Sequence, residues 1–276
     1  MVQRAQKIRT TASAKPVGNV TRGTTNPNRL RRVDRWLAGA QAWRLRTESE
    51  PLVVDLGYGA SPDTAVELYQ RLAKVQPGVR LTGIEIEPER VARAQALSTE
   101  KLNFILGGFE IPTEQQPTIV RAFNVLRQYE EEDVAEIWRT VLARLSPQGL
   151  FVDGTCDEIG RRAAWVALEK SGPVSLTIAQ RFGSFELPSE VAERLPKALI
   201  HRNVPGEKVH GFLQALDRAW LEASALSTFG TRQRWQASCQ ALKDASWPVL
   251  DGPSRWRLGE LTVAWDAVSP RATHSP

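Results

Sequence analysis

Cysteine is scarce in this 276-residue chain, which holds only Cys156 and Cys239. Two cysteines are too few for a disulfide framework or a cysteine-based metal site, so we expect no bound metal and a reducing compartment. Long apolar runs are also missing, since no stretch approaches the roughly 20 residues that span a membrane. The N-terminus is polar and basic rather than signal-like, and we therefore expect a cytoplasmic protein with no membrane partner.

Acidic residues are almost absent from the first 46 positions. Of the 36 basic and 31 acidic residues, eleven basic ones and one acid, Asp34, lie in residues 1–46, which leaves 25 and 30 for the rest. A basic arm on an acidic body indicates an anionic partner such as RNA, a solubilising tail, or an arm that folds back on its own body. No aromatic residue precedes Trp36, which favours the last two interpretations.

Apolar periodicity begins only after the arm. Residues 1–28 lack it, and we expect them to be disordered or ordered only by contact. Leu30, Val33 and Leu37 recur at helical spacing and predict an amphipathic helix over about 28–46. Five short apolar runs then alternate with helical patterns, which predicts a parallel sheet with right-handed crossovers. The expected strands are 52–56, 80–86, 102–106, 118–124 and 149–153, and the expected helices are 62–75, 88–98 and 130–145.

Beyond Cys156 the alternation becomes irregular. We expect a helix at 159–170, a strand at 174–182, a helical stretch broken by Pro196, and two terminal strands, WPVL and GELTVAW. Further helices are expected at 207–226 and 231–245. The predicted organisation is a flexible basic arm (1–28), a core (29–156), a mainly helical insertion or cap (157–230), the rest of the core (231–268) and a tail (269–276).

The stretch PLVVDLGYGASPDT, residues 51–64, carries the clearest chemical signal. Gly57 and Gly59 permit a tight turn after a buried strand and let a ligand approach the backbone. Ser61 is expected to cap the next helix, with Pro62 at its first position, and that helix end is electropositive. Strand, glycine turn and helix together suit the polar part of a nucleotide-like ligand.

Four motifs follow one another between about 52 and 155: VVDLGYGAS, TGIEIEPERVARA, FNVLRQY and VAEIWRTVLARLSPQGLFVD. In this order they resemble the class I S-adenosylmethionine-dependent methyltransferases. The resemblance implies an α/β, Rossmann-like, seven-stranded and mostly parallel sheet. Helices would cover both faces, the last strand would be antiparallel, and a largely helical insertion would lie over the site.

The resemblance also implies a cofactor site for S-adenosylmethionine. Gly57 and Gly59 would admit its methionine end, Asp55 would accept a bond from its amino group, and Glu85 would bind the ribose hydroxyls. The alternative for both acids is a structural role at a strand end. A nicotinamide or flavin dinucleotide fits less well, because Pro62 stands where its fingerprint has a third glycine.

The adenine contact departs from the family pattern. Gly108 stands where the family often places an acid, so the backbone amide of Phe109 would hold adenine; Glu110 is the weaker alternative for that contact and is otherwise expected to face solvent. Asn124, Arg127 and Tyr129 lie where family members line the methyl channel and are the catalytic candidates, Asn124 also for cofactor binding. Tyr129 could equally be a packing residue.

The acceptor is less determined than the donor. We expect residues 22–29 to fold over the cofactor pocket or grip a phosphate-bearing substrate, or else to form a flexible linker. The candidates for substrate binding are Arg29, Arg31, Arg32 and His201. A small-molecule acceptor is favoured, and an RNA methyltransferase that uses the basic arm or a non-catalytic cofactor-binding protein are the alternatives. The acceptor atom, any general base and the oligomeric state stay open.

Overall fold

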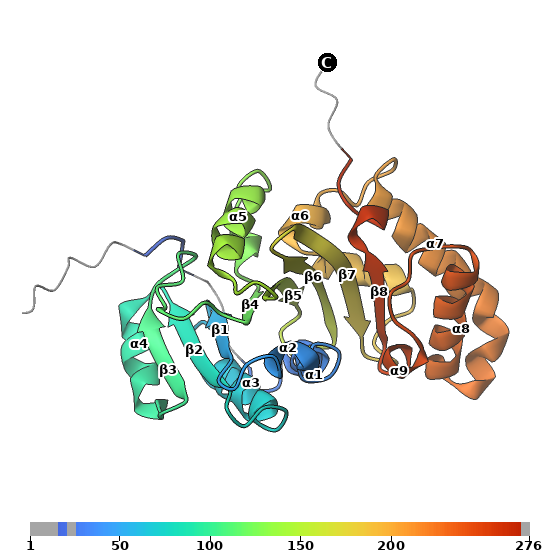
Figure 1. The fold of residues 1–276 in the computed structure, drawn as a ribbon. Coiled ribbons are helices and arrows are strands. Elements are labelled where there is room, and N and C mark those ends of the chain that lie inside the picture. The colour runs from blue at the N-terminus through green and yellow to red at the C-terminus, as the bar shows by residue number, and fades with distance from the viewer. Residues whose placement is uncertain (1–15, 21–25, 272–276) are drawn as a thin grey trace, which may run out of the picture.

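An eight-stranded sheet forms the centre of the molecule in the computed structural model, which describes residues 16–20 and 26–271 (Figure 1). The strand order is β3-β2-β1-β4-β5-β6-β7-β8. The strands are β1 (Leu52–Leu56), β2 (Arg80–Glu85), β3 (Leu102–Leu106), β4 (Ile119–Phe123), β5 (Leu150–Cys156), β6 (Arg162–Glu169), β7 (Gly172–Gln180) and β8 (Glu260–Ala264).

Helices of the first half of the chain lie where the apolar spacing predicts them. The predicted helix over 28–46 is two shorter ones, α1 (Arg31–Gly39) and α2 (Ala42–Leu45). The others up to β5 are α3 (Asp63–Ala73), α4 (Pro88–Ala94), η1 (Gln95–Leu97), η2 (Leu126–Gln128) and α5 (Val134–Arg144). Those of the second half are η3 (Pro188–Arg194), α6 (Lys197–Ile200), α7 (Lys208–Glu222), η4 (Ala223–Phe229), α8 (Thr231–Asp244), α9 (Pro253–Trp256) and η5 (Trp265–Ala267).

Strands β1 to β5 are parallel, as predicted, and their order reverses at β1. The chain moves outward through β2 and β3, then returns to place β4 on the other side of β1. Such a reversal separates the loops that follow β1 and β4 and opens a crevice at the carboxyl ends of the strands. The α/β, Rossmann-like fold class is therefore confirmed, and the crevice is where a ligand is expected.

The second half of the sheet differs from the prediction. Residues 162–169 form the buried strand β6 rather than a helix, and β6, β7 and β8 join the sheet antiparallel, giving eight strands instead of seven. The sequence RAAWVALE predicted a helix because its alanines and leucine have high helix propensity. A strand that is buried on both faces also lacks the alternation of apolar and polar residues that would identify it as a strand. Of WPVL, only Val249 pairs with β8, through one bridge to Val263.

Two apolar clusters cover the two faces of the sheet. On one face α1, α2 and α3 contribute Val33, Leu37, Leu45 and Leu68. On the other face α5, α7 and α8 pack against the strands, with Trp220 and Trp235 from the helical part of the second half (Figure 1). The region 157–230, expected to be mainly helical, thus begins with the hairpin β6–β7 before its helices. Among the described residues, no helix has the length and apolar character needed to cross a bilayer.

Candidate functional site

The turn after β1 has the geometry that its glycines predict. Gly57 and Gly59 adopt φ values of 69° and 87°, in the left-handed region that favours glycine. The Gly57 amide donates to the Ile84 carbonyl at 2.7 Å, which ties the turn to the end of β2. Ser61 does not cap the helix as expected, because α3 begins at Asp63 after Pro62 and no side chain bonds to its first amides.

Glu85 ends β2 with its carboxylate buried beneath the glycine turn. Its Oε2 accepts from the Gly59 amide at 2.9 Å, and its Oε1 accepts from the Ile86 amide at 2.9 Å. Arg90 lies nearby, with Nη1 3.6 Å from Oε2. The carboxylate therefore positions the turn, and it also lines a pocket at the carboxyl ends of the strands. Its predicted bond to a ribose stays a prediction.

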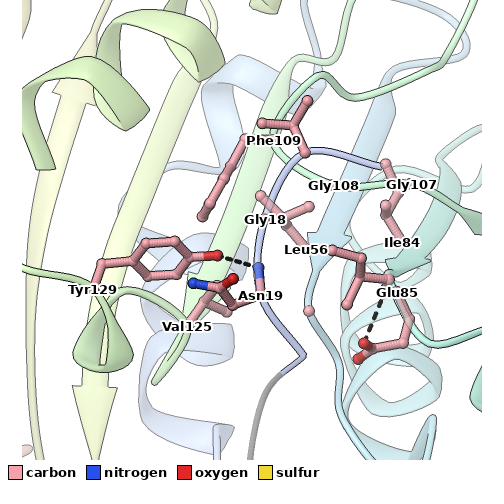
Figure 2. A pocket seen from close by; sticks show the side chains of 13 residues that line it. Gly18, Asn19, Leu56, Ile84, Glu85, Gly107, Gly108, Phe109, Val125 and Tyr129 are labelled. Atoms are coloured by element: carbon pink, nitrogen blue, oxygen red, sulfur yellow. Dashed lines mark hydrogen bonds between the residues drawn. The ribbon is translucent and has the colours of Figure 1, made fainter. Parts of the chain in front are cut away.

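A first chamber lies at the carboxyl ends of β1, β2 and β3, and its empty space is about 270 Å³ when the open solvent at its mouth is included (Figure 2). Five predicted site residues line it: Gly57, Glu85, Gly108, Phe109 and Tyr129. The other lining residues of the body are Leu56, Ile84, Ile86, Gly107 and Val125, and three more belong to the arm, Val17, Gly18 and Asn19. The walls are thus mostly apolar, with one carboxylate and one phenol at opposite sides.

The arm segment 16–20 crosses this chamber. The Phe109 amide, which we expected to hold adenine, donates to the Val17 carbonyl at 3.0 Å. The backbone amide of Asn19 donates to Tyr129 Oη at 2.5 Å (Figure 2). A Cβ on Gly108 would stand 2.0 Å from the Val17 carbonyl oxygen, so only glycine admits the arm here. This contact depends on pairing residues about ninety positions apart, and no local motif signals it.

Glu110 takes part in the same contact. Its Oε2 accepts from the Val17 amide at 2.9 Å and its Oε1 from the Gly108 amide at 2.8 Å. The expectation that Glu110 faces solvent is therefore wrong, because the arm supplies it with a backbone donor. Together with Phe109 and Tyr129, Glu110 thus fixes two arm residues, Val17 and Asn19.

The segment predicted to cover the pocket or to grip a phosphate-bearing substrate is 22–29, of which the structure describes 26–29. Residues 22–25 lie outside the described residues. Asn26 Nδ2 donates to the Glu158 carbonyl at 3.0 Å, and the Asn28 amide donates to Glu67 Oε1 at 2.7 Å. The start of α1 is therefore attached to the loop after β5 and to α3.

Asp55 belongs to a buried ionic network. Arg121, which is fully buried in β4, donates from Nε to Asp55 Oδ1 at 2.9 Å and from Nη2 to Oδ2 at 2.6 Å. Its Nη1 pairs with Asp34, the single acid of the basic segment, and Arg71 Nη1 reaches the other oxygen of Asp34 at 2.8 Å. Both Asp55 oxygens thus have a partner, and a bond to a cofactor amino group stays a prediction.

Burial sets the proton affinities in this network. It raises the pKa of Asp34 to about 6, although Arg121 and Arg71 act in the opposite direction. Burial alone would lower the pKa of Arg121, but Asp55 and Asp34 outweigh it and hold that pKa above its usual range. A lone arginine in the apolar strand IVRAF is the sequence signal for such a pair, and our sequence analysis missed it.

A second chamber adjoins the first at Gly57, and its empty space is about 300 Å³ when open solvent is included. Among its lining residues are Asp55, Asn124 and Arg29 from the predicted sites, with Leu30, Tyr58, Thr64 and Phe123. Asn124 follows β4 with φ 59°, an uncommon conformation for a non-glycine residue. Its Oδ1 accepts from the Cys156 amide at 3.1 Å, which joins the ends of β4 and β5.

Gly59 lines neither chamber, since its amide is bound to Glu85, and four other predicted residues also lie away from both. Arg31 Nη1 donates to the Asn28 carbonyl, and Arg32 donates to the carbonyls of Gly160 and Leu258. Arg127 Nη1 donates to the Glu193 carbonyl at 3.0 Å, and His201 is exposed after α6. Of the predicted substrate contacts, the structure brings only Arg29 to a chamber wall. The described residues contain no cluster of His, Cys, Asp and Glu suited to a metal.

Comparison with known proteins gives structural likenesses only. No family model and no curated protein sequence matches this chain. Human N-acetylserotonin methyltransferase bound to SAM is 22% identical over 46% of this chain and 37% of that one, with a TM-score of 0.31. The mitomycin 7-O-methyltransferase MmcR is 18% identical over 45% and 38%, with a TM-score of 0.32. LepI in complex with SAH and a substrate analogue is 20% identical over 48% and 33%, with a TM-score of 0.37.

This chain thus spans well under half the length of each of these solved proteins. At such identities and scores the likeness concerns part of the fold. We therefore build the function on the residues of this chain.

Proposed function

We propose that this chain is a methyltransferase that takes its methyl group from S-adenosylmethionine and delivers it to a small molecule. The observation that supports it best is the pair of chambers that meet at the glycine turn. The first contains a buried carboxylate, Glu85, which suits a ribose diol, and the Phe109 amide, which would suit an adenine once the Val17 carbonyl is displaced from it. The second contains Asp55, which suits the cationic methionine end.

In this arrangement Gly57 lies under the bend of the cofactor, because it lines both chambers. The sulfonium methyl would face the ends of β4 and β5, where Asn124 and Cys156 are hydrogen-bonded to each other. Methyl transfer is an in-line displacement, so this wall has to align the acceptor and keep water out. Asn124 is our candidate for that positioning role, and Tyr129 lies on the adenine side instead.

A small-molecule acceptor is favoured over RNA by the contacts of the basic residues that directly follow the arm. Arg29 and Arg32, at the start of α1, donate to backbone carbonyls of the body, and α1 itself is anchored by the buried Asp34. These arginines therefore serve the fold. Both thiols, Cys156 and Cys239, are buried and free, which agrees with a reducing compartment such as the cytoplasm.

Glu85→Gln tests the cofactor site. Loss of a carboxylate that accepts both ribose hydroxyls removes charge-assisted bonds worth about 1.5–3 kcal/mol, so we expect S-adenosylmethionine to bind roughly 10- to 100-fold more weakly. Titration calorimetry with S-adenosylmethionine and S-adenosylhomocysteine measures this. Glu89→Gln, an exposed acid on α4, is the matched control and should bind as the wild type does. A wild-type protein that binds neither compound refutes the proposal.

Transfer of label identifies the acceptor class. The protein is incubated with methyl-tritiated S-adenosylmethionine and separate fractions of metabolites, RNA and protein. Label in the metabolite fraction supports the proposal, and label in RNA would replace it by RNA methylation. Cofactor binding without label in any fraction would indicate a non-catalytic binding protein.

A further inference from the structure

An open hollow of about 730 Å³, its mouth included, lies between the β5–β6 turn and the end of β7. Four of its lining residues are charged: Asp157, Arg161, Arg162 and Arg181. The hollow is at the carboxyl end of β5 and so at the same edge of the sheet as the two chambers. Neither the cofactor site nor the buried network uses these arginines.

Two of the arginines lie opposite each other, and neither forms an ion pair with a described residue. The Arg181 amide donates to the Arg161 carbonyl at 2.7 Å, which places the two residues opposite one another just beyond the pair Arg162–Gln180. Like charges directly opposite on neighbouring strands destabilise a sheet. Neither guanidinium forms an ion pair with a described residue, and both side chains are exposed. The arrangement has a cost that a bound anion would remove.

The acids near the hollow are already engaged. The Asp157 carboxylate accepts from the backbone amides of Arg161 at 2.8 Å and Arg162 at 3.1 Å. Arg162 is the one arginine with a partner, since its Nη2 lies 2.5 Å from Glu190 Oε2 and donates to the Ser184 carbonyl. Hydrogen bonds from amides leave the charge of Asp157 in place, so three positive charges and one negative charge line the hollow.

We propose that this hollow, lined by Arg161, Arg162 and Arg181, binds a phosphate group carried by a small molecule. Planar guanidiniums bind phosphate through paired, charge-assisted hydrogen bonds, which suits converging arginines. The arginines converge in one concavity instead of forming a stripe along the surface, which favours a small molecule over a nucleic-acid backbone.

The hollow lies next to the second chamber. Arg29 lines that chamber, and its Nε donates at 3.0 Å to the carbonyl of Asp157, which lines the hollow. A molecule anchored by its phosphate here would extend past Arg29 toward Asn124. The identification of this molecule with the methyl acceptor rests on the proposed function, whereas phosphate binding by the hollow does not.

Phosphate and pyrophosphate are the probes for the test. Calorimetric titration of the full chain with each anion should show one site, and the variant Arg161→Gln/Arg181→Gln should bind both at least 10-fold more weakly. Arg139→Gln is the matched control, because Arg139 is an arginine exposed on α5, and it should bind as the wild type does. No binding by the wild type, or equal binding by the double variant, overturns the proposal.

The cofactor titration separates the two hypotheses. The double variant should bind S-adenosylmethionine as the wild type does, which also verifies that it is folded. Failure of the wild type to bind the cofactor would refute the proposed function and leave phosphate binding standing. A single-stranded RNA that displaces pyrophosphate and loses affinity steeply with added salt would overturn the small-molecule assignment.

Discussion

At the scale of single residues, Asp153 on β5 is a buried acid that lacks a counter-charge. Trp138 Nε1 donates to its Oδ2 at 3.0 Å, and its Oδ1 has no partner among the described residues. Burial raises its pKa to about 7, against the effect of the Trp138 bond. A free Asp has a pKa of about 3.9. Between about pH 4 and pH 7 the folded protein therefore keeps a proton on Asp153 that the unfolded chain has released.

Asp153→Asn should remove this pH dependence. The stability that protonated Asp153 contributes is complete below about pH 4 and is lost as the pH rises through about 7. Asparagine keeps the bond to Trp138 and does not ionise, so its advantage over the wild type should grow with pH, by about 4 kcal/mol at most. Urea unfolding of both proteins from pH 4 to 8 measures it. Burial also raises the pKa values of Asp34, Asp251 and Glu260, but these groups titrate in both proteins and cancel in the difference between them. Parallel curves for the two proteins would contradict the prediction.

Residue identities in the sequence predicted the parts of the site that depend on local backbone geometry. Gly57 and Gly59 have the expected left-handed conformations, because a turn between a buried strand and a helix needs them. Contacts between residues that are far apart in the sequence could not be predicted from residue identities. The bond from Phe109 to Val17 and the pair Asp55–Arg121 each depend on how remote segments pack.

At the scale of secondary-structure elements, prediction was reliable where apolar spacing was unambiguous. The helix α3 has one buried stripe, Ala65, Leu68 and Leu72, and its bounds agree with the expected ones to within two residues. Strand β6 is buried on both faces, so its sequence lacks the alternation that distinguishes a strand from a helix. The hairpin it starts was therefore missed, and with it the hollow at its end.

The arm segment 16–20 is the element whose removal should change cofactor affinity. Its Val17 carbonyl uses the Phe109 amide that adenine would need, so a bound cofactor has to displace this contact. Deleting residues 1–20 should therefore tighten S-adenosylmethionine binding by about 10-fold, equivalent to about 1.4 kcal/mol, the strength of one or two such bonds. Calorimetric Kd values test this. Deleting residues 1–15 retains the contact and should leave the Kd unchanged. Weaker binding after the longer deletion would show that the arm forms part of the cofactor pocket.

At the scale of the whole molecule, the one acid of the basic N-terminal segment attaches that segment to the body of the protein. The single acid of the first 46 residues, Asp34, is fully buried and meets Arg121 and Arg71. Arg121 also binds Asp55 on β1 and donates to the Thr64 carbonyl on α3 at 3.0 Å. One side chain thus connects the basic helix α1 to the strands and the helix that form the site.

Arg121→Met should consequently destabilise the entire protein. It leaves Asp34 and Asp55 buried without their shared partner, and the loss of one member of a buried ionic network costs about 3–5 kcal/mol. Urea unfolding at pH 7 should show this loss, whereas Arg139→Met on the surface of α5 should change stability by less than about 0.5 kcal/mol. The variant Arg121→Met/Asp34→Asn/Asp55→Asn should recover part of the loss, because it removes the unpaired charges along with the arginine. A cost below about 1 kcal/mol for Arg121→Met would place it among ordinary substitutions and show that α1 is held by its apolar face alone.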